Sequence, residues 1–304
     1  MTNQRAFIVG GAGFIGSRLA RDLIAQGREV VVFDRLSTGR KDLLPNGAAL
    51  VQGDILDQAA LLDAMRQSRP GVVFHLAALH FIPYCNAHPQ ETLRVNVEGT
   101  ENVLRACAEI PPDRVVFASS AAVYGVSDQA YSEDASLEPI DIYGISKVAA
   151  EMLVERFHRE SDIPCTTVRL FNVYGPNDTV AHLMPELVAQ AKRGGQVELG
   201  NLEPRRDYVH VEDVSRAFQL VSQVDGEFGL FNVGTGVEYS VLELVETLSS
   251  ITGARLNVQS VESRRRSAER MHLRSDPARL IAKTGWRPRR EMREALTEML
   301  NGLS

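Results

Sequence analysis

Two hydrophobic periodicities alternate along the first half of the chain. Short, continuous apolar runs lie at residues 6–9, 30–33, 50–51, 72–74 and 115–118, and a further strand is predicted at 166–170. Between them, apolar side chains recur at helical spacing in residues 14–26, 58–67, 90–109 and 143–160. Continuous runs are typical of strands that are covered on both faces. The alternation of such strands with helices predicts an α/β fold built on a doubly wound parallel sheet.

The pattern changes after about residue 172. Helices are predicted at residues 183–192 and 211–221, short strands at 197–199 and 230–233, and a mainly helical remainder from residue 240. We therefore predict a nucleotide-binding domain over residues 1–172, to which residues 211–235 return. Residues 173–210 and 236–304 are predicted to form a smaller, mainly helical substrate lobe.

Composition and charge narrow the class of protein. The 304 residues are 44% hydrophobic and 24% charged, with a net charge of −6, which is ordinary for a soluble globular chain. There is no broad basic field that would favour nucleic acid or an anionic membrane. No apolar stretch approaches the roughly 18 residues that span a bilayer, and the first residues do not resemble a signal peptide. Three widely spaced cysteines predict a cytoplasmic protein without a metal site.

A glycine motif follows the first predicted strand. Residues 10–16 read GGAGFIG, which places Gly10, Gly13 and Gly16 at the entrance of a predicted helix. Glycine lets the backbone approach a pyrophosphate, and the helix N-terminus supplies N–H donors and a positive dipole. Asp34 ends the second predicted strand, where a carboxylate binds a ribose 2′-hydroxyl and repels a 2′-phosphate. The motif therefore favours NAD over NADP, although the adjacent Arg35 could accept a 2′-phosphate.

A second motif indicates the chemistry. Tyr143 and Lys147 lie four residues apart at the start of a predicted helix, so their side chains share one face. A nearby ammonium is expected to lower the pKa of the tyrosine, which would make Tyr143 a general base. Ser119 and Ser120 end a predicted strand, where open α/β sheets bind their ligands. The prediction is a catalytic set of Ser120, Tyr143 and Lys147.

Together these residues resemble the extended short-chain dehydrogenase/reductase superfamily, in its NAD-dependent sugar-nucleotide epimerase/dehydratase branch, whose nucleotide domain is Rossmann-type. The resemblance spans nearly the whole chain and follows family order. It also rests on DRLSTG at 34–39, GDI at 53–55, HLAA at 75–78, NVEGT at 96–100, SSAAVYG at 119–125, RLFNVYGP at 169–176 and RDYVH at 206–210.

The resemblance implies NAD as cofactor and assigns roles by position. Contacts with the cofactor are implied for Gly10, Gly13, Phe14, Ile15, Gly16, Asp34, Arg35, Ser37, Thr38, Gly39, Asp54, Ile55, Leu76, Ala77, Ala78, Asn96, Ser119, Tyr143, Lys147 and Phe171. Contacts with a sugar nucleotide are implied for His80, Ser120, Tyr143, Asn172, His182, Leu183, Arg206, Arg266, Glu269 and Leu273. Of these, Asn172, Arg206 and Arg266 match residues that bind the diphosphate. Packed histidines and a solvated arginine loop at 264–266 are the alternative interpretations.

Within this branch the chain looks most like the UDP-glucose 4-epimerases. Dehydratases carry an acid where this chain has Ala121 and Ala122, so no acid is placed to expel a hydroxyl. The resemblance implies NAD-dependent epimerisation at C4 of a nucleotide-diphosphate hexose through a transient 4-keto intermediate. A reductase or dehydrogenase acting on a 4-keto sugar nucleotide is the alternative. The nucleotide base and the sugar stay open, and a homodimer formed through residues 90–109 and 143–160 is expected.

Overall fold

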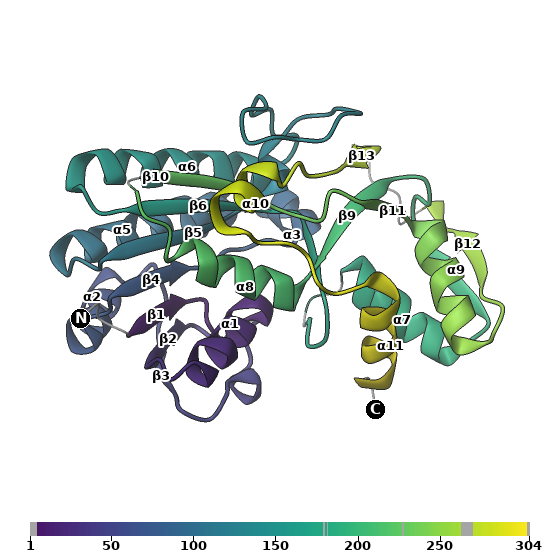
Figure 1. Cartoon of the computed structure of the whole chain (residues 1–304), viewed down its shortest axis with the longest axis horizontal. Coiled ribbons are helices and arrows are strands. Elements are labelled where there is room, and N and C mark those ends of the chain that lie inside the picture. Colours follow the sequence, from purple (N-terminus) through teal and green to yellow (C-terminus); the bar gives the residue numbers. More distant parts are fainter. Residues whose placement is uncertain (1–4, 179, 181, 227, 263–269, 303–304) are drawn as a thin grey trace.

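A seven-stranded parallel sheet forms the centre of the larger part of the molecule (Figure 1). The computed structural model describes residues 5–178, 180, 182–226, 228–262 and 270–302. The strand order is β10-β6-β5-β4-β1-β2-β3. In chain order the strands are β1 (Ala6–Val9), β2 (Val30–Asp34), β3 (Ala48–Gln52), β4 (Val72–His75), β5 (Arg114–Ser120), β6 (Cys165–Leu170) and β10 (Phe228–Val233). The sheet runs outward in both directions from β1 and β4, as predicted for a doubly wound fold.

Helices cover both faces of this sheet. One apolar cluster packs α1 (Phe14–Ala25), α8 (Val211–Val221) and α10 (Ala278–Thr284) against one face. A second cluster packs α2 (Gln58–Ser68), α5 (Gly99–Glu109) and α6 (Ile142–Ser161) against the other. Because both faces are covered, the strands are buried along their length, which explains their continuous apolar runs.

A smaller lobe lies on the side of the molecule opposite to the N-terminal strand (Figure 1). Its apolar core joins α7 (Leu183–Arg193), α9 (Val241–Thr252) and α11 (Met292–Gly302). One small sheet contains β7 (Asn172–Tyr174), β9 (Arg205–His210), β11 (Glu238–Ser240) and β13 (His272–Leu273), and another pairs β8 (Gln196–Leu199) with β12 (Asn257–Ser260). The lobe is thus mainly helical, as predicted, but the short strands β7, β9, β11, β12 and β13 were not foreseen.

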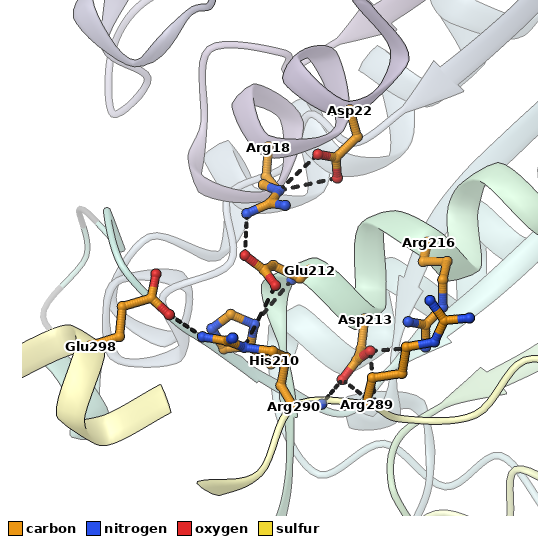
Figure 2. Close-up of polar contacts among 9 residues, drawn as sticks. All are labelled: Arg18, Asp22, His210, Glu212, Asp213, Arg216, Arg289, Arg290 and Glu298. Atoms are coloured by element: carbon orange, nitrogen blue, oxygen red, sulfur yellow. Dashed lines mark hydrogen bonds and ion pairs between the residues drawn. The ribbon is translucent and has the colours of Figure 1, made fainter. Parts of the chain in front are cut away.

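An ion-pair network ties the C-terminal segment to the glycine-loop helix (Figure 2). Arg18 of α1 pairs with Glu212 of α8 at 2.6 Å, and Glu212 lies 3.5 Å from Arg290. Asp213, which is fully buried, accepts hydrogen bonds at 3.0 Å from the backbone N–H groups of Arg289 and Arg290. These contacts fix the lobe against the helix that begins at the glycine motif.

The helical stretch predicted over residues 90–109 is continuous but not uniform. It comprises α4 (Pro89–Leu93), a π-helical turn, η2 (Arg94–Glu98), and α5, and it follows the short helix α3 (Ile82–Ala87). Single-turn 3₁₀ helices η1 (Lys41–Leu43) and η3 (Ala121–Val123) complete the described elements. In the part of the chain that the structure describes, no helix combines the length and the apolar character needed to cross a membrane.

Candidate active site

The glycine loop connects β1 to α1 through close backbone contacts. Gly10 has φ of +80°, and a Cβ atom there would lie 2.6 Å from the backbone nitrogen of Ala77. At Gly16 a Cβ atom would lie 2.5 Å from the carbonyl oxygen of Gly10. Gly13 is the N-cap of α1 and has no side chain to occupy the first N–H groups of that helix. The loop therefore has the open, donor-rich backbone that a pyrophosphate requires.

Asp34 lies beside this loop at the end of β2. Its carboxylate is buried and accepts hydrogen bonds from the backbone N–H of Ala12 at 2.9 Å and of Leu36 at 2.7 Å. A Cβ atom at Gly39 would lie 2.8 Å from this carboxylate. Each carboxylate oxygen has two lone pairs, so capacity remains for ribose hydroxyls. The loop and Asp34 together fit the adenosine half of a dinucleotide.

The contacts of Arg35 bear on whether it could accept the 2′-phosphate of NADP. Its guanidinium donates to Ser37 at 2.8 Å and lies 3.4 Å from the Asp54 carboxylate. Asp54 itself also accepts from the backbone N–H of Leu56 at 3.0 Å. Arg35 is thus held by a hydroxyl and by a carboxylate that a 2′-phosphate would have to displace.

The remaining predicted cofactor residues fall into two groups. Phe14 and Ile15 open α1, Ser37 and Thr38 are exposed after β2, and residues 76–78 follow β4 against Gly10. Ile55 and Phe171, in contrast, are buried in apolar clusters. Because Ile55 packs against Gly99, where a Cβ atom would come within 2.4 Å of it, its side chain belongs to the core.

Asn96 lies on the π-helical turn and uses its whole side-chain amide. The amide accepts from the N–H of Leu79 and donates to its carbonyl, both at 2.8 Å, and it also donates to Ser146 at 2.9 Å. Ser146 in turn donates to the carbonyl of Tyr143 at 2.7 Å. Asn96 therefore connects the loop after β4 to the first turn of α6.

The predicted catalytic residues meet where β5 ends and α6 begins. Asp141 caps α6 by accepting from the N–H of Gly144 at 2.8 Å, which sets the start of the helix. Lys147 is buried and donates to the carbonyl oxygen of Ala118 at 2.8 Å. Ser120 forms a side-chain hydrogen bond with Tyr143 and accepts from the N–H of Ala122 at 3.1 Å. Ser120, Tyr143 and Lys147 are thus together.

The electrostatics differ from the expectation. Burial raises the pKa of Tyr143, although its hydrogen bond with Ser120 works against the rise. Burial lowers the pKa of Lys147 to about 8, while the negative charge of Glu151 opposes this fall. The Lys147 ammonium is directed to a carbonyl and lies 5.9 Å from the centre of the Tyr143 ring. The pKa of Tyr143 is therefore raised in the polypeptide by itself, where a lowered value was predicted, because loss of hydration outweighs the hydrogen bond with Ser120.

Ser119 faces a different network from Ser120. Its hydroxyl donates to Glu151, whose carboxylate pairs with Arg169 at 2.7 Å. Arg169 also donates to the hydroxyl of Tyr124 and to the carbonyl of Glu133, both at 3.0 Å. All of these side chains are buried. Ser119 is therefore engaged inside the protein, whereas Ser120 faces Tyr143.

The predicted sugar side collects residues from separate segments. Asn172, on β7, donates to the carbonyl of Asp207 at 3.3 Å. Arg206, on β9, donates to the carbonyl of Arg270 at 2.7 Å. Leu183 begins α7, while Leu273 is buried in an apolar cluster with Tyr124 and Tyr131. Leu273 is thus placed as a core side chain.

His80 and His182 lie side by side across these segments. Their ring centres are 5.4 Å apart, and His182 contacts the buried carboxylate of Asp178 at 2.9 Å. Loss of hydration lowers the pKa of His80, and the neighbouring His182 adds to this lowering. The two histidines therefore meet each other rather than packing separately. Arg266 and Glu269 lie outside the described residues.

Two further residues organise the site without having been predicted. Arg270 is buried, and its guanidinium donates to the carbonyls of Ala122 at 3.1 Å and Gly125 at 2.9 Å, so it holds the loop after Ser120. Asp178 orients His182. The spacing of four residues between Asp178 and His182 was a usable signal, but nothing local indicates that Arg270 contacts a loop 145 residues earlier.

Comparison with known proteins adds to this geometry. Residues 6–234 match the model of the NAD dependent epimerase/dehydratase family. The chain belongs to that family. It is 34% identical over 308 residues to UDP-glucose 4-epimerase of Mycolicibacterium smegmatis, with 97% of each chain covered. The resemblance inferred from the motifs is therefore confirmed, and so is the predicted cofactor, NAD.

Solved structures agree with the fold as a whole. UDP-glucose 4-epimerase of Thermotoga maritima, crystallised with UDP-glucose, gives a TM-score of 0.91 at 30% identity, with 98% of each chain covered. The UDP-glucose 4-epimerase of Thermus thermophilus, in complex with NAD, gives 0.90 at 29% identity, again with 98% of each chain covered. The predicted Rossmann-type sheet with a smaller lobe is confirmed.

Proposed function

We propose that this epimerase interconverts the C4 epimers of a UDP-hexose of the glucose/galactose type. Its activity is NAD-dependent epimerisation at C4 of a nucleotide sugar. The proposal rests on the meeting of Ser120, Tyr143 and Lys147 at the carboxyl edge of the parallel sheet, the same edge at which the glycine loop follows β1. Ala121 and Ala122 follow Ser120, so an elimination has no acid at that position.

We assign the chemistry to the same three side chains. Bound NAD supplies the acceptor, and later the donor, of the C4 hydride. Tyr143 takes the proton of the 4-hydroxyl and returns it, and Ser120 holds the oxygen by a hydrogen bond. Lys147, as a cation, favours the phenolate of Tyr143 and holds a ribose hydroxyl. Between the two half-reactions the sugar would have to turn, so that C4 presents its opposite face.

Binding follows from the two sides of the site. The glycine loop and Asp34 hold the dinucleotide, with Asp54 and residues 76–78 around it. Arg206 and Asn172 are assigned to the diphosphate, because a guanidinium and an amide suit its oxygens. His80 and His182 are assigned to the sugar hydroxyls. We propose residues 1–172 and 211–235 as the nucleotide-binding domain and residues 173–210 and 236–304 as the substrate lobe, with α10 of the second range packed against the large sheet.

The test uses purified protein and five separate substrates: UDP-glucose, UDP-galactose, UDP-GlcNAc, UDP-glucuronate and GDP-mannose. Products are separated by chromatography while NADH absorbance is followed. Formation of UDP-galactose from UDP-glucose without net NADH is the expected result. NADH that accumulates in proportion to product would instead establish a dehydrogenase. Conversion of another substrate alone would move the proposal to that sugar.

We also propose a cytoplasmic homodimer. Leu93 on α4 and Ile145 and Met152 on α6 are exposed apolar side chains, and α4 contacts α6. The three cysteines are free and buried, which suits a reducing compartment. Light scattering after size-exclusion chromatography is expected to give twice the chain mass, and Met152→Asp is expected to give the monomer.

A further inference from the structure

We propose that Glu151 is a positioning residue of the active site, whose buried carboxylate keeps Lys147 a cation and fixes the strand end that carries Ser120. This inference rests on the proposed function, since it assigns a task to Lys147 in that reaction. Glu151 itself lies among protein groups and is not assigned a contact with substrate.

Side chains on one face of α6 contact successive residues at the end of β5. Tyr143, Lys147 and Glu151 succeed one another at intervals of four residues, so they share one face of the helix. Opposite this face, three consecutive strand residues each hold one of them. Ser120 forms a hydrogen bond with Tyr143. The carbonyl of Ala118 accepts a hydrogen bond from Lys147 at 2.8 Å, and the hydroxyl of Ser119 donates one to Glu151.

Two residues, Ser119 and Arg169, hold the Glu151 carboxylate. Arg169 donates to it from Nη2 at 2.7 Å and from Nε at 3.0 Å. Arg169 is in turn fixed by Tyr124 and by the carbonyl of Glu133. Burial alone would lower the pKa of Arg169, but the hydrogen bonds and charge of Glu151 raise it. A carboxylate held by these bonds cannot rotate away from Lys147.

The titratable groups around Lys147 are mostly neutral. His75 of β4 is neutral, because burial lowers its pKa to about 3. Burial raises the pKa of the Cys85 thiol on α3 and of Tyr143, so both are protonated at neutral pH. Among the described groups that face Lys147, Glu151 supplies the negative charge, and Arg169 of β6 lies beyond it and offsets part of that charge.

The consequence concerns the pH range of activity. Burial brings the pKa of Lys147 to about 8, and Glu151 keeps it from falling further. Without that negative charge the ammonium would lose its proton nearer to neutral pH. A neutral Lys147 no longer favours the phenolate of Tyr143, so the reaction would lose its base at a lower pH than in the native protein.

The direct test observes Lys147 without catalysis. The chain has four lysines, Lys41, Lys147, Lys192 and Lys283, so protein labelled with ¹³C-lysine gives few signals to titrate by NMR. Lys147→Met identifies the signal of interest. In Glu151→Gln, we expect the titration midpoint of Lys147 to fall by about one pH unit. Glu155→Gln is the matched control, because Glu155 is exposed on the same helix and pairs with Arg159 at 3.8 Å.

Catalysis gives the second readout. In Glu151→Gln, the pH at which kcat declines on the alkaline side is expected to fall by the same interval, while KM for the sugar nucleotide stays unchanged. Glu151→Asp, which keeps the charge, is expected to restore the native profile in part. If the native protein epimerises none of the substrates, the proposed function fails, yet the titration still decides the task of Glu151.

The variant also needs a check on folding, because Glu151→Gln leaves the buried Arg169 without its counter-charge. Glu151→Gln combined with Arg169→Met removes both charges, and circular dichroism shows which variants are folded. The folded variant is expected to show the lowered Lys147 midpoint. A native Lys147 titration and a native pH profile in a folded variant that lacks the Glu151 carboxylate would overturn the inference.

Discussion

On the proposed cofactor side of the site, one unbroken stretch from β1 through β2 supplies the glycine loop and Asp34. On the proposed sugar side, by contrast, Asn172, His182 and Arg206 come from three separate segments. The cofactor side offers mostly backbone, and its tolerances are set by the space around Gly10 and Gly16. The sugar side offers side chains held by distant partners. A dinucleotide can therefore be bound by a local motif, while sugar recognition depends on how the lobe is assembled.

The largest effect is expected where the two sides meet. Tyr143→Phe removes the hydroxyl that exchanges the proton, so kcat should fall by about 10³-fold, within the usual contribution of a general base. The content of bound NAD should stay native. The exposed Tyr84, which donates to Glu91 at 2.6 Å, provides a matched control in Tyr84→Phe. Near-native turnover in Tyr143→Phe would remove Tyr143 from the mechanism.

On the cofactor side, NAD binding should be sensitive to changes that displace the backbone of the glycine loop. In Gly16→Ala the added Cβ would lie 2.5 Å from the Gly10 carbonyl oxygen, so the loop must move. Overpacking of this kind costs about 1–3 kcal/mol, and we expect NAD affinity to fall by about 100-fold at most, measured by fluorescence titration. Gly27→Asn is the control, since Gly27 has φ of +78° and nothing within 4 Å. Equal affinity in both variants would argue against the backbone as the binding surface.

On the sugar side, replacing a single side chain should weaken binding of the sugar nucleotide. Arg206→Leu removes charge-assisted hydrogen bonds to the diphosphate, which are worth about 1.5–3 kcal/mol, so KM for UDP-glucose should rise by about 10-fold or more. Affinity for NAD should not change. The comparison variant is Arg293→Leu, because Arg293 on α11 donates to Ser250 and is far from β9 in sequence. A fall in NAD affinity would show that the two sides are not separate.

The last effect concerns stability rather than catalysis, and it involves His75 on β4 and His210 on β9. Burial lowers the pKa of His75, at the end of β4, to about 3 and that of His210, at the end of β9, to about 4. Both stay neutral in the folded chain, while the unfolded chain takes up protons below its ordinary pKa of 6.5. Stability is therefore complete above that pH and falls as pH decreases toward the folded values. Between pH 7 and pH 5 each histidine should cost roughly 2 kcal/mol.

Urea unfolding at the two pH values measures this loss. His75→Gln and His210→Gln are each expected to be less stable than the native chain at pH 7, because a buried contact is lost. Their further loss between pH 7 and pH 5 should nevertheless be smaller by roughly 2 kcal/mol. A native pH dependence in either variant would mean that the histidine concerned is not the group that titrates.

Much of the fold and of the cofactor side could be predicted because the information is local. The run 6–9, the glycines that follow and Asp34 lie within one strand–helix–strand unit, whose geometry is short-range. Lys147 follows Tyr143 by about one helical turn, so the sequence also predicted that the two side chains share one face of the helix. The strands β7, β11 and β13 were not predicted, because two or three residues are too few to show a periodicity. The six-residue strand β9 was also missed, and each of the three short strands pairs with it from far away in the chain.

The sequence by itself determined the doubly wound sheet, predicted NAD as cofactor and indicated that Ser120, Tyr143 and Lys147 lie together, because each depends on motifs and spacing within one element or between adjacent ones. Only the tertiary structure decided that Ser119 turns inward to Glu151, that Leu273 belongs to a core, and that Arg270 holds the loop after Ser120. It also decided the pKa direction of Tyr143, because burial depends on the whole fold and loss of hydration outweighs the hydrogen bond with Ser120.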